Sequence, residues 1–237
     1  YKSKKYMLYN RNNSINIKYE YDDSGNPTSY LGKELDIRNG LLLGYYENDN
    51  EEEVIYQYNS EGIRVSKNVN SILTEYTVSG SKILEEKRGN DSIIYMYDIQ
   101  GELVSFEYNG TMYIYIKNGT SDITGIADEE GNLLCSYIYD GYGKCEIIEY
   151  DDSSIGYINP LRYRGYYYDE ETGFYYLNSR YYDPETGRFI SPDDVSYLGA
   201  SGTVLSYNLF AYCENNPVNC IDSNGFGPIG ISSSSKL

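Results

Sequence analysis

The sequence has 237 residues, a formal net charge of −17 and no histidine. The lack of histidine excludes Ser-His-Asp triads, Cys-His pairs and His-ligated zinc, and the acidic balance argues against nucleic acid or an anionic membrane as a direct partner. No apolar run is long enough to cross a bilayer, so we expect no membrane insertion by this segment.

Tyrosine occurs 32 times, and many of these residues belong to a repeated pattern of Tyr-x-Tyr, three mostly polar residues and Gly. Copies of this pattern occupy 19–25, 56–62, 95–101, 113–119 and 137–143. The chain begins within the pattern, so we expect it to be part of a longer protein, with a sheet edge near Tyr1 that upstream repeats would pair.

Each copy predicts a strand, a turn and a second strand. Side chains alternate along a strand, so Tyr-x-Tyr places both rings on one face of a sheet. Asp or Asn then opens a turn, and Gly supplies the positive φ that such turns often need. A single hairpin cannot bury its aromatic face, so the copies must stack. We expect an all-β fold with an antiparallel sheet of stacked hairpins, acidic turns outside, and these rings inside: Tyr19, Tyr21, Tyr56, Tyr58, Tyr95 and Tyr97.

The second half of the chain has a different pattern. It contains "NPLRYRGYYYDEETGFYYLNSRYYDPETGRFISPDD" at 159–194 and "NLFAYCENNPVNCIDSNG" at 208–225. Together with the Tyr-Asp repeats, these segments resemble the bacterial Rhs family of YD-repeat proteins, and the second half resembles the Rhs repeat-associated core. The resemblance predicts a YD-repeat shell segment at 1–158, a core at 159–227 that closes the shell, and a flexible strap at 228–237.

The resemblance implies a spiralling hollow β-shell around a variable C-terminal toxin, which a self-cleaving aspartyl-type core releases inside the shell. The motif positions that match are Arg180, Asp193 and Asp222, and the cut is expected after Leu237. Two residues depart from the family pattern, because Asp194 and Ser223 stand where the family usually has proline. Proline would restrict the backbone beside each aspartate, so Asp194 is an alternative to Asp193 in the catalytic role.

The chemistry of these residues has two interpretations. Two carboxylates held close together cannot both ionise easily, so one can donate a proton while the other accepts one from water, and a neighbouring arginine can stabilise the negative charge. Such a group would be a single-turnover endopeptidase that needs no cofactor and no metal. The alternative is structural, because Asp is common in turns and arginine readily packs on a sheet surface.

Three further features carry weaker expectations. Cys135 and Cys145 are symmetric about Asp140 and could face each other across a hairpin, although free thiols are the default interpretation of the four cysteines. Leu205, Leu209 and Tyr212 have helical spacing, which predicts a short helix over 205–214 in the core. Residues 225–237 change to small, flexible types and predict a strap that is not a folded element.

The leading functional hypothesis is a toxin shell and core, secreted or carried on the surface of a bacterium. Its expected partners are its own toxin cargo, the upstream repeats and an immunity protein for the toxin. The alternative is a non-catalytic YD-repeat module for cell-surface adhesion or carbohydrate binding. The toxin's activity and its target cell do not follow from the residues.

Overall fold

A computed structural model describes residues 4–9, 16–47, 52–194, 196, 198–199, 202, 204–222, 224–227 and 229–230. The predicted all-β class is confirmed, and the first fifteen strands form one antiparallel sheet in strict chain order. In chain order they are β1 (Lys4–Tyr9), β2 (Asn16–Tyr21), β3 (Pro27–Tyr30), β4 (Lys33–Arg38), β5 (Leu41–Glu47), β6 (Glu52–Tyr58), β7 (Arg64–Val69), β8 (Ile72–Ser79), β9 (Lys82–Arg88), β10 (Asp91–Tyr97), β11 (Leu103–Tyr108), β12 (Thr111–Lys117), β13 (Ile123–Ala127), β14 (Leu133–Tyr139) and β15 (Cys145–Glu149). Among the described residues, no helix is long and apolar enough to span a membrane.

The turns between these strands use the chemistry that the repeat predicts. In the turn between β10 and β11, Asp98 Oδ1 accepts hydrogen bonds from the backbone N–H groups of Gln100 (2.9 Å) and Glu102 (2.8 Å). Gly101 has a φ of +83°, which L-residues seldom adopt. The repeat did not include the hairpin of β4 and β5, whose turn is Asn39-Gly40 with both φ values positive. An Asn-Gly pair is a standard signal for such a turn.

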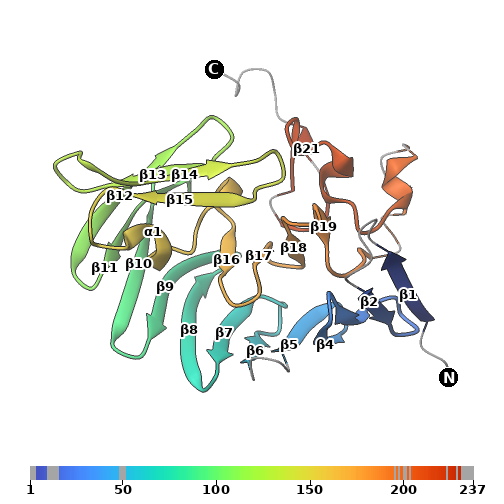
Figure 1. Cartoon of the computed structure of the whole chain (residues 1–237). Coiled ribbons are helices and arrows are strands. Elements are labelled where there is room, and N and C mark those ends of the chain that lie inside the picture. The colour runs from blue at the N-terminus through green and yellow to red at the C-terminus, as the bar shows by residue number, and fades with distance from the viewer. Residues whose placement is uncertain are drawn as a thin grey trace.

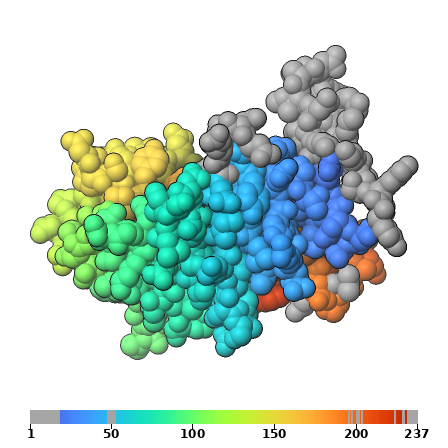
Figure 2. Space-filling model, turned by 90° about the horizontal axis from the view of Figure 1, so that it is seen from below, coloured from blue at the N-terminus to red at the C-terminus, as the bar shows by residue number. Residues whose placement is uncertain are grey.

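The Tyr-x-Tyr rings face the interior, as predicted. Tyr56 and Tyr95 are buried, and Tyr19, Tyr21, Tyr58 and Tyr97 are partly buried, so none of the six is exposed. The acidic turn residues Asp98, Glu130 and Asp140 are not buried. Figure 2 shows the sheet from below as an outer wall, in which the strands follow one another from blue to yellow.

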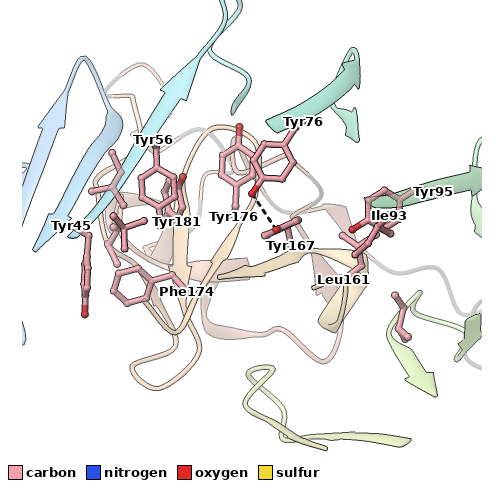
Figure 3. Close-up of a cluster of buried hydrophobic side chains, with 14 of the residues drawn as sticks. Tyr45, Tyr56, Tyr76, Ile93, Tyr95, Leu161, Tyr167, Phe174, Tyr176 and Tyr181 are labelled. Atoms are coloured by element: carbon pink, nitrogen blue, oxygen red, sulfur yellow. Dashed lines mark hydrogen bonds between the residues drawn. The ribbon is translucent and has the colours of Figure 1, made fainter. Parts of the chain in front are cut away.

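A smaller sheet lies inside the curve of the large one (Figure 1). Its strands are β16 (Tyr167–Asp169), β17 (Phe174–Tyr176), β18 (Tyr181–Asp183) and β19 (Arg188–Phe189). Tyrosines of both sheets meet in one buried cluster (Figure 3), where the Tyr76 hydroxyl donates to the Tyr167 hydroxyl at 3.1 Å. The repeats thus bury their aromatic face against the second half of the chain.

The short helix expected over 205–214 is replaced by two 3₁₀ turns, Leu205–Tyr207 and Tyr212–Asn215. Asn208 ends the first turn in an extended conformation, and its Oδ1 accepts the Phe210 N–H. This local bond competes with helix formation. The one α-helix of the described residues is α1 (Ile155–Ile158), which lies before residue 159.

Two smaller expectations are also wrong. Cys135 pairs with Glu149 and Cys145 with Tyr139, because the turn centres the β14–β15 hairpin on residue 142 and not on Asp140. All four cysteines are free, which confirms the default interpretation of free thiols. The segment after Gly225 is not wholly unfolded, since β21 (Ile229–Gly230) pairs with β20 (Cys220–Ile221).

Candidate functional site

The three motif residues reach one place from three different connections. Arg180 directly precedes β18, Asp193 follows β19, and Asp222 follows β20. Arg180 Nη2 lies 2.8 Å from Asp193 Oδ2 and 3.6 Å from Asp222 Oδ2. The expected convergence of the three side chains is therefore found, although convergence alone does not test a catalytic role.

Arg180 is held on several sides and is 5% exposed. Its Nη1 donates to the Leu209 carbonyl at 3.0 Å, its Nε donates to the Gly225 carbonyl, and its guanidinium lies 3.6 Å from the centre of the Phe189 ring. Burial lowers the pKa of the guanidinium, although Asp193 and then Asp222 act in the opposite direction. The contacts leave the side chain little freedom to turn away from the two carboxylates.

Asp222 is the more enclosed of the two carboxylates, at 1% exposed. Its Oδ1 accepts the backbone N–H groups of Gly225 (2.8 Å) and Gly227 (3.2 Å). Its carbonyl accepts the Tyr166 hydroxyl at 2.8 Å. Asp222 thus organises the loop that follows it as well as facing Arg180.

Asp193 is only partly buried and differs from Asp222 in its surroundings. Burial raises the pKa of its carboxyl, Arg180 and the Asp194 N–H lower it, and the charges of Asp222 and Asp194 raise it, with a net increase. Asp193 therefore keeps its proton to a higher pH than an ordinary aspartate. Asp194 is exposed, and its carboxylate accepts the Ser196 N–H at 2.8 Å, which lowers its pKa.

A pocket of about 540 Å³ opens beside Arg180 and Asp193. One wall consists of three hairpin turns of the large sheet, which contribute residues within 24–26, 39–41 and 61–63. The other wall is formed by 178–180, 192–194 and Phe226. Asp222 does not line the pocket, so Asp193 is the carboxyl of the pair that faces it.

Sequence reasoning missed two parts of this arrangement. It did not identify Ser179, whose hydroxyl donates to the Asn224 carbonyl at 2.7 Å, or the role of Gly225 in receiving Arg180. No spacing signal distinguishes this serine from the others, because its partner is 45 residues away. Leu237, the expected cleavage residue, and Ser223 lie outside the described residues. The described residues contain no cluster of three or more side chains that could hold a metal ion.

Comparison with known proteins agrees with this architecture. Residues 39–218 match the family described as Teneurin YD-shell. The tRNA3(Ser)-specific nuclease WapA of Bacillus spizizenii is 36% identical over 212 residues, which make up 86% of this chain and 9% of the relative. Double-stranded DNA deaminase toxin A of Burkholderia cenocepacia is 33% identical over 113 residues, 45% of this chain and 7% of the relative. This chain therefore matches less than a tenth of the length of either relative.

A solved structure shows the same fold. The crystal structure of TcdB2-TccC3-Cdc42 superposes with a TM-score of 0.69 and 19% identity. The match covers 94% of this chain and 12% of the other. At this level of identity the likeness concerns the fold alone.

Proposed function

Because the chain belongs to the Teneurin YD-shell family, we propose that it is the C-terminal shell and core segment of a bacterial Rhs-type toxin. In this proposal residues 1–158 supply part of the shell wall, residues 159–227 close it, and the protein is exported with a toxin cargo enclosed. The core then cuts its own chain and frees the cargo. The similarity to a nuclease and to a deaminase toxin, each far longer than this chain, supports the presence of further domains.

One observation supports the cutting step most directly. A single guanidinium nitrogen, Arg180 Nη2, contacts both Asp193 and Asp222, next to a pocket that could receive an extended segment. Histidine is absent from the sequence, so imidazole-based triads are not available, whereas a carboxyl pair hydrolyses peptides without histidine or a metal. Arg180 would stabilise the charge that develops as the peptide carbonyl is attacked.

The proposed reaction is ordinary peptide hydrolysis. A water molecule attacks the carbonyl carbon while the ionised carboxyl of the pair removes its proton. Asp193, the carboxyl that faces the pocket and whose pKa is raised by burial, protonates the carbonyl oxygen. Collapse of the tetrahedral intermediate then breaks the C–N bond, and a proton passes to the leaving amine. Water is the only co-reactant.

The test is a precursor that extends beyond Leu237. The parent should yield two fragments, cut after Leu237, at a rate that does not depend on protein concentration, because the substrate is tethered to the site. Asp193→Asn and Asp222→Asn should each remain uncut while the circular dichroism spectrum stays that of the parent. The catalytic assignment fails if both asparagine variants are cut like the parent, and Asp194→Asn would be tested next.

The second candidate function, a non-catalytic adhesion or carbohydrate-binding module, rests on the other contacts of Arg180. The guanidinium also donates to two backbone carbonyls, an arrangement that suits a purely structural ion cluster. On this hypothesis the extended parent stays whole, and the protein retains glycans on an array.

A further inference from the structure

Two hairpin tips meet beside Arg180. One is the turn 177–180, between β17 and β18, in which the Leu177 N–H donates to the Arg180 carbonyl at 2.9 Å. The other is the loop 222–228, between β20 and β21. The first tip thus belongs to the small inner sheet, and the second leads into the chain that follows Gly230.

Three sets of hydrogen bonds join or shape these tips. Ser179 Oγ donates to the Asn224 carbonyl at 2.7 Å, and Arg180 Nε donates to the next carbonyl, that of Gly225. Asp222 Oδ1 accepts the N–H groups of Gly225 and Gly227. Two consecutive residues of the turn, Ser179 and Arg180, therefore bind two consecutive carbonyls of the loop, those of Asn224 and Gly225.

Gly225 lies at the closest approach and is buried. A Cβ placed on it would lie 2.4 Å from Ser179 Oγ, 2.9 Å from the Leu177 carbonyl oxygen and 3.3 Å from the Arg180 nitrogen. Two of these three atoms are backbone and cannot rotate away. Its φ of +77° also disfavours any L-residue with a side chain. Any other L-residue at 225 would therefore push the loop off the turn that carries Arg180.

We propose that Gly225 and Ser179 are positioning residues for the self-cleavage reaction. Their contacts seat Asn224 and Gly225 on the Arg180 turn, and this seat holds the Arg180 guanidinium against the carboxylates of Asp193 and Asp222. The inference rests on the proposed function. Its physical reason is that catalysis by positioned groups is sensitive to displacements of about 1 Å, which can cost about a hundredfold in rate.

The test uses the extended precursor and a matched pair of glycines. Gly131 has a φ of +85°, and a Cβ added to it would meet no atom within 4 Å, so Gly131→Ala carries the same backbone strain without the contact. Gly131→Ala should be cut at the parent bond and the parent rate. Gly225→Ala should be cut at least about tenfold more slowly, as seen by intact-mass measurement over time. Ser179→Ala, which loses one hydrogen bond, should slow about threefold to tenfold.

The outcomes separate this inference from the proposed function. If Gly225→Ala and Ser179→Ala are cut at the parent bond and rate, the inference is overturned while self-cleavage stands. If Gly225→Ala does not fold, Ser179→Ala decides. If the extended parent itself stays whole, self-cleavage fails, and hydrogen exchange then tests the contact between the loop and the turn. The amides of Gly225 and Gly227 should exchange faster in Ser179→Ala than in the parent. Unchanged exchange overturns the proposed contact as well.

Discussion

Arg64 and Asp169 form an ion pair between the large sheet and the small one, with 2.5 Å between Nη1 and Oδ2 and with both side chains almost fully buried. Lys67 adds a second contact to the same carboxylate at 2.9 Å. The Arg64 guanidinium also lies over several tyrosine rings, among them Tyr167 and Tyr176 at 4.6 and 4.5 Å from the ring centres. Charge and aromatic packing therefore join the large sheet and the small sheet at the same point.

Breaking this pair should destabilise the protein strongly. Asp169→Asn leaves the buried Arg64 without its carboxylate and Lys67 with Glu171 alone, which we expect to cost about 3–5 kcal/mol in the free energy of unfolding. The control is Glu185→Gln, which breaks the exposed pair with Lys144 and should not change the unfolding midpoint measurably. Equal midpoints for the two variants in urea would show that the buried pair is not needed.

The same pair predicts how stability depends on pH. Burial alone would raise the pKa of Asp169, but Arg64 and Lys67 outweigh it, so the pKa is lowered. A carboxyl with a lowered folded pKa contributes stability above its unfolded pKa, about 3.9, and loses it as the pH falls through the folded value. The parent should therefore lose stability below about pH 4. Asp169→Asn should show a smaller loss over that range.

The raised pKa of Asp193 predicts that the rate of self-cleavage falls as the pH rises. Its pKa is raised, so the proton is retained to a higher pH than in an ordinary aspartate. If Asp193 donates this proton, the rate of self-cleavage should fall as the pH rises through its folded pKa. Asp193 also contributes to the stability of the fold in the same pH direction. This contribution is present below the unfolded pKa of about 3.9 and is lost as the pH rises through the folded pKa. A cleavage rate that rises steadily from about pH 4 to about pH 8 would contradict the role of Asp193 as donor.

Buried tyrosines should carry much of the stability. Tyr56 is 2% exposed and contacts Tyr181 with 5.3 Å between ring centres. Tyr56→Ala should cost about 3–5 kcal/mol, because it removes buried contacts and leaves a cavity. Tyr157 is 56% exposed, so Tyr157→Ala is the matched control and should stay close to the parent. Chemical denaturation of both variants measures the difference.

The edge of the large sheet should promote association. Among the described strands, β1 pairs with β2 alone, which leaves its other side as a sheet edge. Unpaired strand edges tend to pair with other chains. We expect the sedimentation coefficient of the 237-residue protein to increase with concentration, and a proline at Tyr6 or at Met7, whichever N–H points away from β2, to reduce the increase. A concentration-independent monomer would contradict this expectation.

The sequence by itself determined the class of fold and the face that each repeat buries. Alternation in Tyr-x-Tyr and the Asp or Asn and Gly of each turn are local properties, so the strands, their turns and the inward direction of rings such as Tyr95 could be predicted from short windows. The three motif residues Arg180, Asp193 and Asp222 were identified through the resemblance to a family. Local chemistry alone favoured a structural role for them in turns and on the sheet surface.

Only the tertiary structure decided which residues far apart in the sequence contact one another. Arg64 pairs with Asp169 across 105 residues, and Ser179 binds the Asn224 carbonyl across 45. No periodic pattern in the sequence predicts either contact, because both depend on how the second half of the chain packs inside the curved sheet. The 3₁₀ turns at 205–215 and the hairpin of β20 and β21 were also missed, although the bonds that form them join residues close in sequence. In those segments the bond from the Phe210 N–H to Asn208 Oδ1 and the short β20–β21 hairpin outweigh the helical spacing and the small, flexible residue types.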